Sequence, residues 1–197
     1  MNKSKIKKLA TVALLMALII VMQAIGSVIP PIGGFTISLV LIPIVIGAIV
    51  LGPGTGAFLG GVFGAIVYIN CITGADPGGA MVFQANPFLC FLVVMAKGIF
   101  AGFLSGILYK ILKNKTNGIF ATIVAAAICP IVNTGVFVLC MLTFFIDVLA
   151  AWANGASIIG YVLTGLILAN FVPELIINVI FAVAGTPVLK TLKNNKW

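Results

Sequence analysis

No charged residue occurs between Leu9 and Ala75. A soluble domain carries about 25% charged residues and could not bury a run of this kind. The whole chain of 197 residues is 62% hydrophobic and 7% charged, and its mean hydropathy is +1.32. The sequence therefore predicts an all-α integral membrane protein, and it excludes a soluble enzyme, a nucleic-acid-binding domain and a disordered tail.

Helix breakers and charges divide the chain into six candidate spanning helices within a single membrane domain, residues 1–197. Pro30-Pro31 ends the first helix, and Gly52-Pro53-Gly54 predicts a tight turn between the second and the third. We expect loops at 30–36 and 72–87, and a loop or interfacial segment at 147–157. The expected helices cover about 9–29, 37–51, 55–71, 88–112, 118–146 and 158–189.

All 11 basic residues are lysines, and all but Lys97 fall in three clusters at 3–8, 110–115 and 190–196. Six spans place these clusters on one side, which the positive-inside rule makes cytoplasmic. The clusters explain the net charge of +8 without a nucleic-acid partner. The first 26 residues imitate a secretory signal, but its cleavage would leave five spans and move the last cluster outside. We therefore favour a retained first helix in a multi-pass protein of the cell membrane, with both termini cytoplasmic.

Glycines repeat every fourth residue in two of the expected helices, a spacing that lets helices pack closely in lipid. They are Gly56, Gly60 and Gly64 in one helix and Gly98, Gly102 and Gly106 in the next. A nucleotide-binding interpretation of 52–61 fails because no Lys-Ser/Thr pair follows. The chain is therefore not expected to be an enzyme or to hydrolyse ATP itself.

The residues that usually hold metals are scarce. There is no histidine, and the only acidic residues are Asp76, Asp147 and Glu174, so a metal site is not expected. Four cysteines show no CxxC spacing and are best interpreted as small apolar core residues. Cys71 and Cys90 are both expected near the outer surface, where a disulfide between them is an open alternative.

Polar residues at membrane depth are the most informative for function. Lys97 lies nine residues into its expected helix. This position is near the midplane of the membrane, where a charge is usually paired or functional. Two interpretations remain open, a Lys97–Glu174 ion pair that fixes helix packing and a ligand site. The other polar residues that could converge with Lys97 are Gln84 and Asn86 before the fourth helix, Asn133 and Thr134 after Pro130, and the stripe Asn170, Glu174 and Asn178.

Several loose motifs together resemble a known family. They are the basic start with the alanines of the first helix, the segment 39–48 running into 51–57, the string Asn170-Phe171-Val172-Pro173-Glu174, and Pro187. With the small size and six expected spans, the chain resembles the substrate-binding subunit (S component) of energy-coupling-factor (ECF) vitamin transporters. Such a subunit binds a vitamin from outside and topples in the membrane to release it inside.

The resemblance implies partners and sites. The expected partners are one transmembrane coupling protein and two ATPase subunits, which use the ATP, so that the chain itself needs no cofactor. An Ala-xxx-Ala face on the first helix, here Ala13 and Ala17, would meet the coupling protein. The family's ligand position would select Gln84, Asn86, Lys97, Asn133, Trp152, Asn170 and Glu174.

One buried cation among several amides suits a small polar ligand that carries a carboxylate. Pantothenate fits this description, riboflavin and folate remain open, and thiamine is disfavoured because few aromatic residues accompany the polar set. A second class is a stand-alone secondary transporter coupled to protons through Glu174 or Lys97. The short chain and the lack of a clear inverted repeat argue against it. A third class is a membrane structural protein without a ligand.

Overall fold

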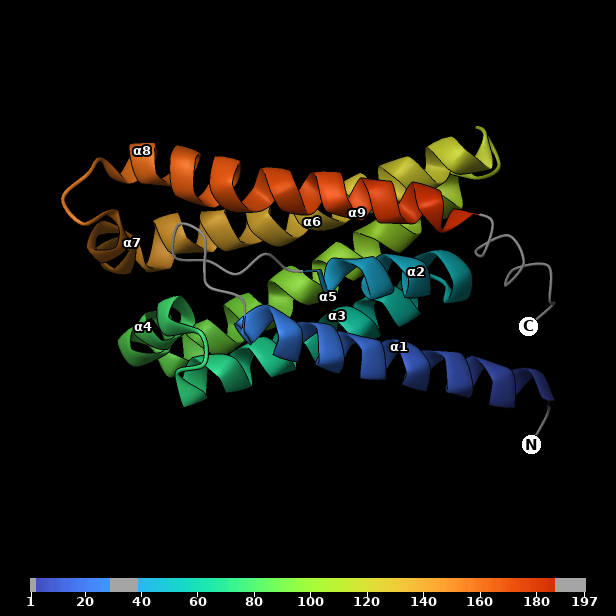
Figure 1. Cartoon of the computed structure of the whole chain (residues 1–197), viewed down its shortest axis with the longest axis horizontal. Coiled ribbons are helices and arrows are strands. Elements are labelled where there is room, and N and C mark those ends of the chain that lie inside the picture. The colour runs from blue at the N-terminus through green and yellow to red at the C-terminus, as the bar shows by residue number, and fades with distance from the viewer. Residues whose placement is uncertain (1–2, 29–38, 187–197) are drawn as a thin grey trace.

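The computed structural model describes residues 3–28 and 39–186, and within these ranges every regular element is helical (Figure 1). The elements follow the chain in the order α1 Lys3–Val28, α2 Leu41–Leu51, α3 Pro53–Thr73, α4 Pro77–Ala85, α5 Pro87–Leu112, α6 Gly118–Phe144, α7 Ile146–Ala153, α8 Ile158–Tyr161, η1 Val162–Phe171 and α9 Val172–Ala184. The expected loop at 30–36 and the end of the expected last helix, 187–189, lie outside the described residues.

Five helices of the described chain are long and apolar enough to cross a membrane. They are α1, α3, α5, α6 and the continuous run 158–184 formed by α8, η1 and α9. The helix expected at 37–51 is shorter in the described part, where α2 has 11 residues, or about 16 Å. An apolar helix of that length is typical of a buried core segment rather than of a full membrane span.

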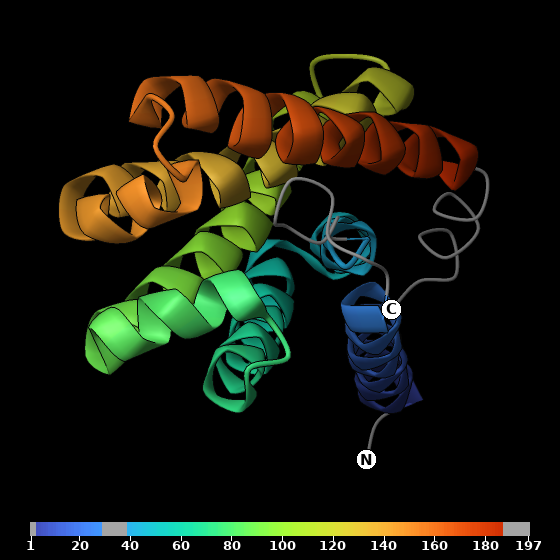
Figure 2. The same cartoon turned by 60° about the vertical axis from the view of Figure 1, so that its left-hand side comes forward.

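The short helix α2 forms the centre of the bundle. It packs against α1, α3, α5, α6 and α9, and Figure 2 shows it between α1 and α9. Eight of its residues are buried, from Leu41 to Ile49, so it is apolar on all sides as a core helix must be. In contrast, α1 is largely uncovered, and only Leu15 and Ile19 of its described side chains are buried.

The two described lysine clusters lie at one end of the bundle. The start of α1 and the α5–α6 connection lie at this end, together with the end of α9, whereas α4, α7 and α8 lie at the opposite end (Figure 1). The clusters at 3–8 and 110–115 therefore lie together, as the expected topology requires. The third cluster, 190–196, is outside the described residues.

A glycine seam joins α3 and α5, as the fourfold spacing predicts. A Cβ added at Gly60 would overlap the carbonyl oxygen of Gly98, and one at Gly56 would overlap that of Gly102. Gly106 extends the seam, because its added Cβ would lie 2.6 Å from Cα of Pro53. Backbones in direct contact leave no space for a side chain, so the prediction of close packing is confirmed.

Two segments expected to be irregular form helices instead. Residues 77–85, within the expected loop 72–87, form α4, because Asp76 stands at the N-cap and Pro77 at the first helical position. Residues 146–153 form α7, which ends at Asn154 in the left-handed conformation, with φ of 45°. Both short helices lie at the end of the bundle opposite the lysines (Figure 1).

Candidate functional site

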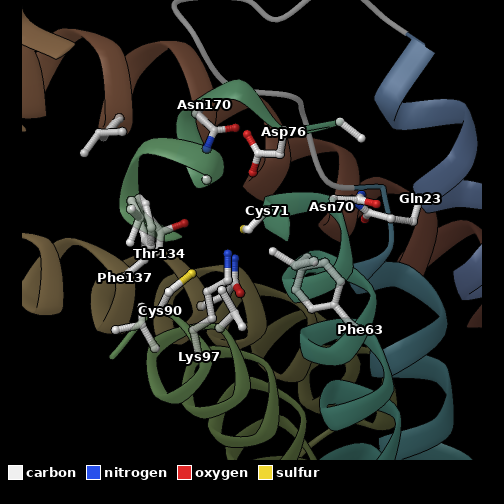
Figure 3. A pocket seen from close by; sticks show the side chains of 18 of the residues that line it. Gln23, Phe63, Asn70, Cys71, Asp76, Cys90, Lys97, Thr134, Phe137 and Asn170 are labelled. Atoms are coloured by element: carbon white, nitrogen blue, oxygen red, sulfur yellow. The ribbon is translucent and has the colours of Figure 1, made fainter. Parts of the chain in front are cut away.

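A cavity lies in the half of the bundle next to α4 and α7 (Figure 3). The space free of protein atoms in the cavity and its mouth, open solvent included, is about 960 Å³. Side chains from α1, α3, α4, α5, α6, α7, η1 and α9 line it. The polar and charged ones are Gln23, Asn70, Asp76, Lys97, Asn133, Thr134, Asn170 and Glu174.

Lys97 reaches the cavity from the middle of α5, between two aromatic rings. Its Nζ lies 5.6 Å from the ring centroid of Phe63 and 5.0 Å from that of Phe137. A Lys97–Glu174 ion pair stays an open alternative to a ligand contact. Cation–π contacts of this kind contribute about 0.5–2 kcal/mol but satisfy none of the three ammonium donors.

Trp152 connects the cavity wall to the short helices. Its ring stacks on Phe137, with centroids 6.4 Å apart and planes at 24°. Its Nε1–H donates to Sδ of Met81 on α4 at 3.3 Å. The indole therefore joins α7, α6 and α4 at the rim of the cavity, and the ring on which it stacks also contacts Lys97.

Two of the asparagines that line the cavity have side-chain oxygens without a hydrogen-bond donor. The side-chain oxygens Oδ1 of Asn133 and Asn170 are buried and accept no hydrogen bond from the described chain. A buried oxygen without a donor costs about 1–3 kcal/mol. Such acceptors are what a ligand's hydroxyl or amide N–H groups would satisfy.

The charges of the cavity are spread over separate elements. In Figure 3, Asp76 and Asn170 point into the cavity from one side and Lys97 from the other, with the Cys71 thiol between them. Glu174 is only 3% exposed and lines the cavity from α9. One cation and two carboxylates thus occupy different parts of one polar cavity, an arrangement that can orient a ligand with unlike ends.

Five of the seven predicted ligand residues line this cavity. They are Lys97, Asn133, Trp152, Asn170 and Glu174. Gln84 is exposed and does not belong to the lining. Asn86 is the N-cap of α5, and its side chain accepts the N–H of Leu89 at 3.0 Å, which gives it a structural role. A ligand contact of any of the seven stays a prediction.

The structure adds lining residues that the sequence analysis did not select. Gln23, Asn70 and Asp76 line the cavity, and Thr134 lies beside Asn133 as its position in the sequence indicated. Gln23 and Asn70 are isolated polar residues within apolar helices, which is the same signal that selected Asn170. Asp76 could have been found as an N-cap next to Pro77, a position that marks the start of a helix.

The alanine face of α1 lies on the uncovered side of the bundle. Ala13 and Ala17 are both exposed, and they are one helical turn apart. Their small side chains leave a shallow surface between Leu14, which is 70% exposed, and Ile20, which is 52% exposed. Such a surface is available to another helix, although docking there stays a prediction.

The chemistry of the cavity is that of binding. No group of three or more potential metal ligands occurs among the described residues. The four cysteines are free thiols. The cavity offers a cation, carboxylates and amide acceptors against aromatic walls, which suits recognition of a small polar molecule.

Comparisons with known proteins point the same way. Residues 7–188 match the family described as "ECF transporter, substrate-specific component". The chain is also similar to the pantothenic acid transporter PanT of Lactococcus lactis subsp. cremoris (strain MG1363). The two are 29% identical over 206 residues, covering 99% of this chain and 100% of that protein.

Proposed function

Because this multi-pass chain belongs to the substrate-specific components of ECF transporters, we propose that it binds pantothenate in the cavity and serves as the binding subunit of an ATP-driven importer. The relative named as a pantothenic acid transporter supports this choice of ligand. The chain would supply recognition, and partner subunits would supply energy.

The observation that carries the proposal is Lys97. Its ammonium lies in a largely enclosed cavity over the rings of Phe63 and Phe137, where it can donate to a carboxylate. Pantothenate offers one carboxylate, one amide and two hydroxyls. The carboxylate would bind Lys97 in a charge-assisted hydrogen bond, and the hydroxyls and the amide N–H would donate to Asn133, Asn170 and the acidic side chains.

The proposal also implies one orientation of the chain in the membrane. Six spans, with the short apolar helix α2 counted as one of them, would place both termini in the cytoplasm beside the lysine clusters. The cavity would then open to the outside, next to α4 and α7. The exposed face of Ala13 and Ala17 would contact a transmembrane coupling protein, and two ATPase subunits would hydrolyse ATP, so the chain itself would use no cofactor.

The test is direct binding to the purified full-length chain. We expect mass spectrometry of molecules released on denaturation to find pantothenate, and calorimetry on the ligand-free chain to give a saturable 1:1 isotherm. Release of riboflavin or folate instead, with no pantothenate isotherm, would assign the cavity to another vitamin. Absence of any ligand in both measurements would favour a structural protein.

A further inference from the structure

Cys71 and Cys90 line the same cavity from two different helices. Cys71 lies near the end of α3 and Cys90 in the first turn of α5, and they are 2% and 1% exposed. Both are free thiols that line the cavity. In Figure 3, Cys90 lies next to Lys97, and Cys71 lies between Lys97 and Asp76.

The glycine seam explains why these thiols stay close. Gly56 faces Gly102 and Gly60 faces Gly98, and one turn further along α3 Gly64 faces Val94. The same antiparallel register brings the end of α3 to the start of α5. Because the two backbones touch along the seam, the helices cannot slide apart at their ends. The seam therefore holds the end of α3 beside the start of α5, which favours a cross-link between the thiols without large backbone movement.

The surroundings of the pair favour thiol chemistry that enters through the cavity. Lys97, two helical turns after Cys90, lines the same cavity, and a nearby cation assists a thiol that must attack as a thiolate. On the other side, Gly79 of α4 lies against Sγ of Cys71. Since α4 covers the pair and the helices enclose it, the cavity mouth is the route for a small reagent.

We propose that Cys71 and Cys90 are a redox-active dithiol in the wall of the ligand cavity, oxidised by low-molecular-weight disulfides and shielded by bound ligand. One cysteine attacks the reagent R–S–S–R, forms a mixed disulfide and releases one RSH. The other attacks the protein sulfur of that mixed disulfide, closes the Cys71–Cys90 bond and releases the second RSH. Both electrons and both thiol protons thus leave in two molecules of RSH. The shielding rests on the proposed function of the cavity.

The first experiment tests the dithiol without any ligand. The full-length chain with Cys129→Ala and Cys140→Ala keeps only the pair, and it is treated with 2-hydroxyethyl disulfide before intact-mass analysis. We expect a monomer that has lost two hydrogens and no longer reacts with iodoacetamide. The matched control adds Cys71→Ser and should stop at the mixed disulfide on Cys90. If the double variant does not fold, peptide mapping of the oxidised parent gives the same information.

Persistence of two alkylatable thiols in the monomer, or cross-linking only between chains, would overturn the proposal. Either result would mean that the pair cannot close within one molecule. The control separates this failure from lack of access, because a mixed disulfide on Cys90 alone shows that the reagent reaches the cavity.

The second experiment measures shielding by pantothenate. If only the ligand-free chain is oxidised, the rate should fall by a factor of one plus the ligand concentration over Kd, about 100-fold at 100 times Kd. Calorimetry supplies Kd independently. Binding by calorimetry with an unchanged oxidation rate would overturn the shielding. No binding by calorimetry would instead overturn the choice of pantothenate, and the first experiment would still decide whether the dithiol exists.

Discussion

Asn178 on α9 donates its side-chain N–H to the backbone carbonyl of Ala126 on α6 at 2.7 Å. The residue four positions after Ala126 is Pro130, which has no N–H to donate to that carbonyl. The adjacent carbonyl of Ala125 accepts the hydroxyl of Ser105 on α5, also at 2.7 Å. The carbonyl that Pro130 leaves without a backbone donor is therefore satisfied by a side chain of α9, and Ser105 of α5 bonds the carbonyl next to it.

This contact predicts a thermodynamic coupling between Asn178 and Pro130. Asn178→Leu should leave the Ala126 carbonyl without a donor, at a cost of about 1–3 kcal/mol in the free energy of unfolding. In a Pro130→Ala chain the restored backbone N–H can donate instead, so the same change should cost less than about 1 kcal/mol. A double-mutant cycle followed by unfolding in detergent measures the difference. Equal costs in both backgrounds would contradict the explanation, and Ile180→Ala on the exposed side of α9 is the control.

Removal of the Lys97 ammonium should weaken pantothenate binding selectively. Lys97→Ala loses a charge-assisted hydrogen bond of about 1.5–3 kcal/mol, or roughly 10- to 150-fold in Kd. The neutral amide analogue, which has no carboxylate, should bind parent and variant about equally. Calorimetry with both ligands measures this, and Lys110→Ala, on the same helix but exposed outside the cavity, should leave both affinities unchanged. Equal loss for both ligands would indicate a change in cavity shape rather than a lost charge contact.

Enlargement of the α1 alanine face should separate transport from binding. Ala13→Trp or Ala17→Trp places a large side chain on an exposed surface far from the cavity. Uptake by the assembled importer should fall to background while the pantothenate Kd changes less than about twofold, an estimate based on the small effects of exposed substitutions. Ile25→Trp, exposed near the other end of α1, is the matched control. Simultaneous loss of binding and folding would mean that the alanines pack within the chain.

The lone chain should bind its ligand without concentrating it. In liposomes that contain only this protein, a proton gradient should produce no accumulation of labelled pantothenate, since the proposal assigns energy coupling to ATPase subunits. The coupling protein and both ATPases are then added to the liposomes. ATP supplied on the side of the membrane that the ATPases face should start uptake. Gradient-driven accumulation by the lone chain would instead identify a secondary transporter.

The seam should tolerate no side chain. Gly60→Ala forces a methyl group into the backbone of α5, and overpacking of this kind costs about 1–3 kcal/mol or more. Gly135→Ala is the matched control, because an added Cβ there meets nothing within 4 Å. That change should be neutral or stabilise by about 0.5–1 kcal/mol, since alanine favours the helix. Thermal unfolding of both variants in the same detergent measures the contrast.

The sequence was sufficient for features that depend on one helix at a time. Prolines and glycines marked most helix ends, and the spacing of Gly60 and Gly98 predicted the seam that the structure contains. The burial of α2 was not predicted, because a run of apolar residues looks the same whether lipid or protein surrounds it. The length of the helix, which the sequence leaves open at its start, is what distinguishes the two cases.

Features that depend on how helices meet were harder to predict. Lys97 and Glu174 were recognised as buried charges in apolar helices, but their contacts depend on helix rotation. The contacts of the Lys97 ammonium with the rings of Phe63 and Phe137 consequently could not be predicted. Asp76 was placed in a loop because the helix that follows it, α4, is short and rich in glycine.

The glycine seam between α3 and α5 also affects how mutations that abolish uptake should be interpreted in genetic screens. Every missense change of a glycine codon adds at least a Cβ, and at Gly56, Gly60, Gly98 and Gly102 that atom would overlap backbone of the facing helix. Random mutagenesis should therefore return null alleles at these codons as often as at Lys97, although none of the glycines needs to touch the vitamin. Protein abundance in the membrane, measured for each allele, separates those that prevent folding from those that impair recognition.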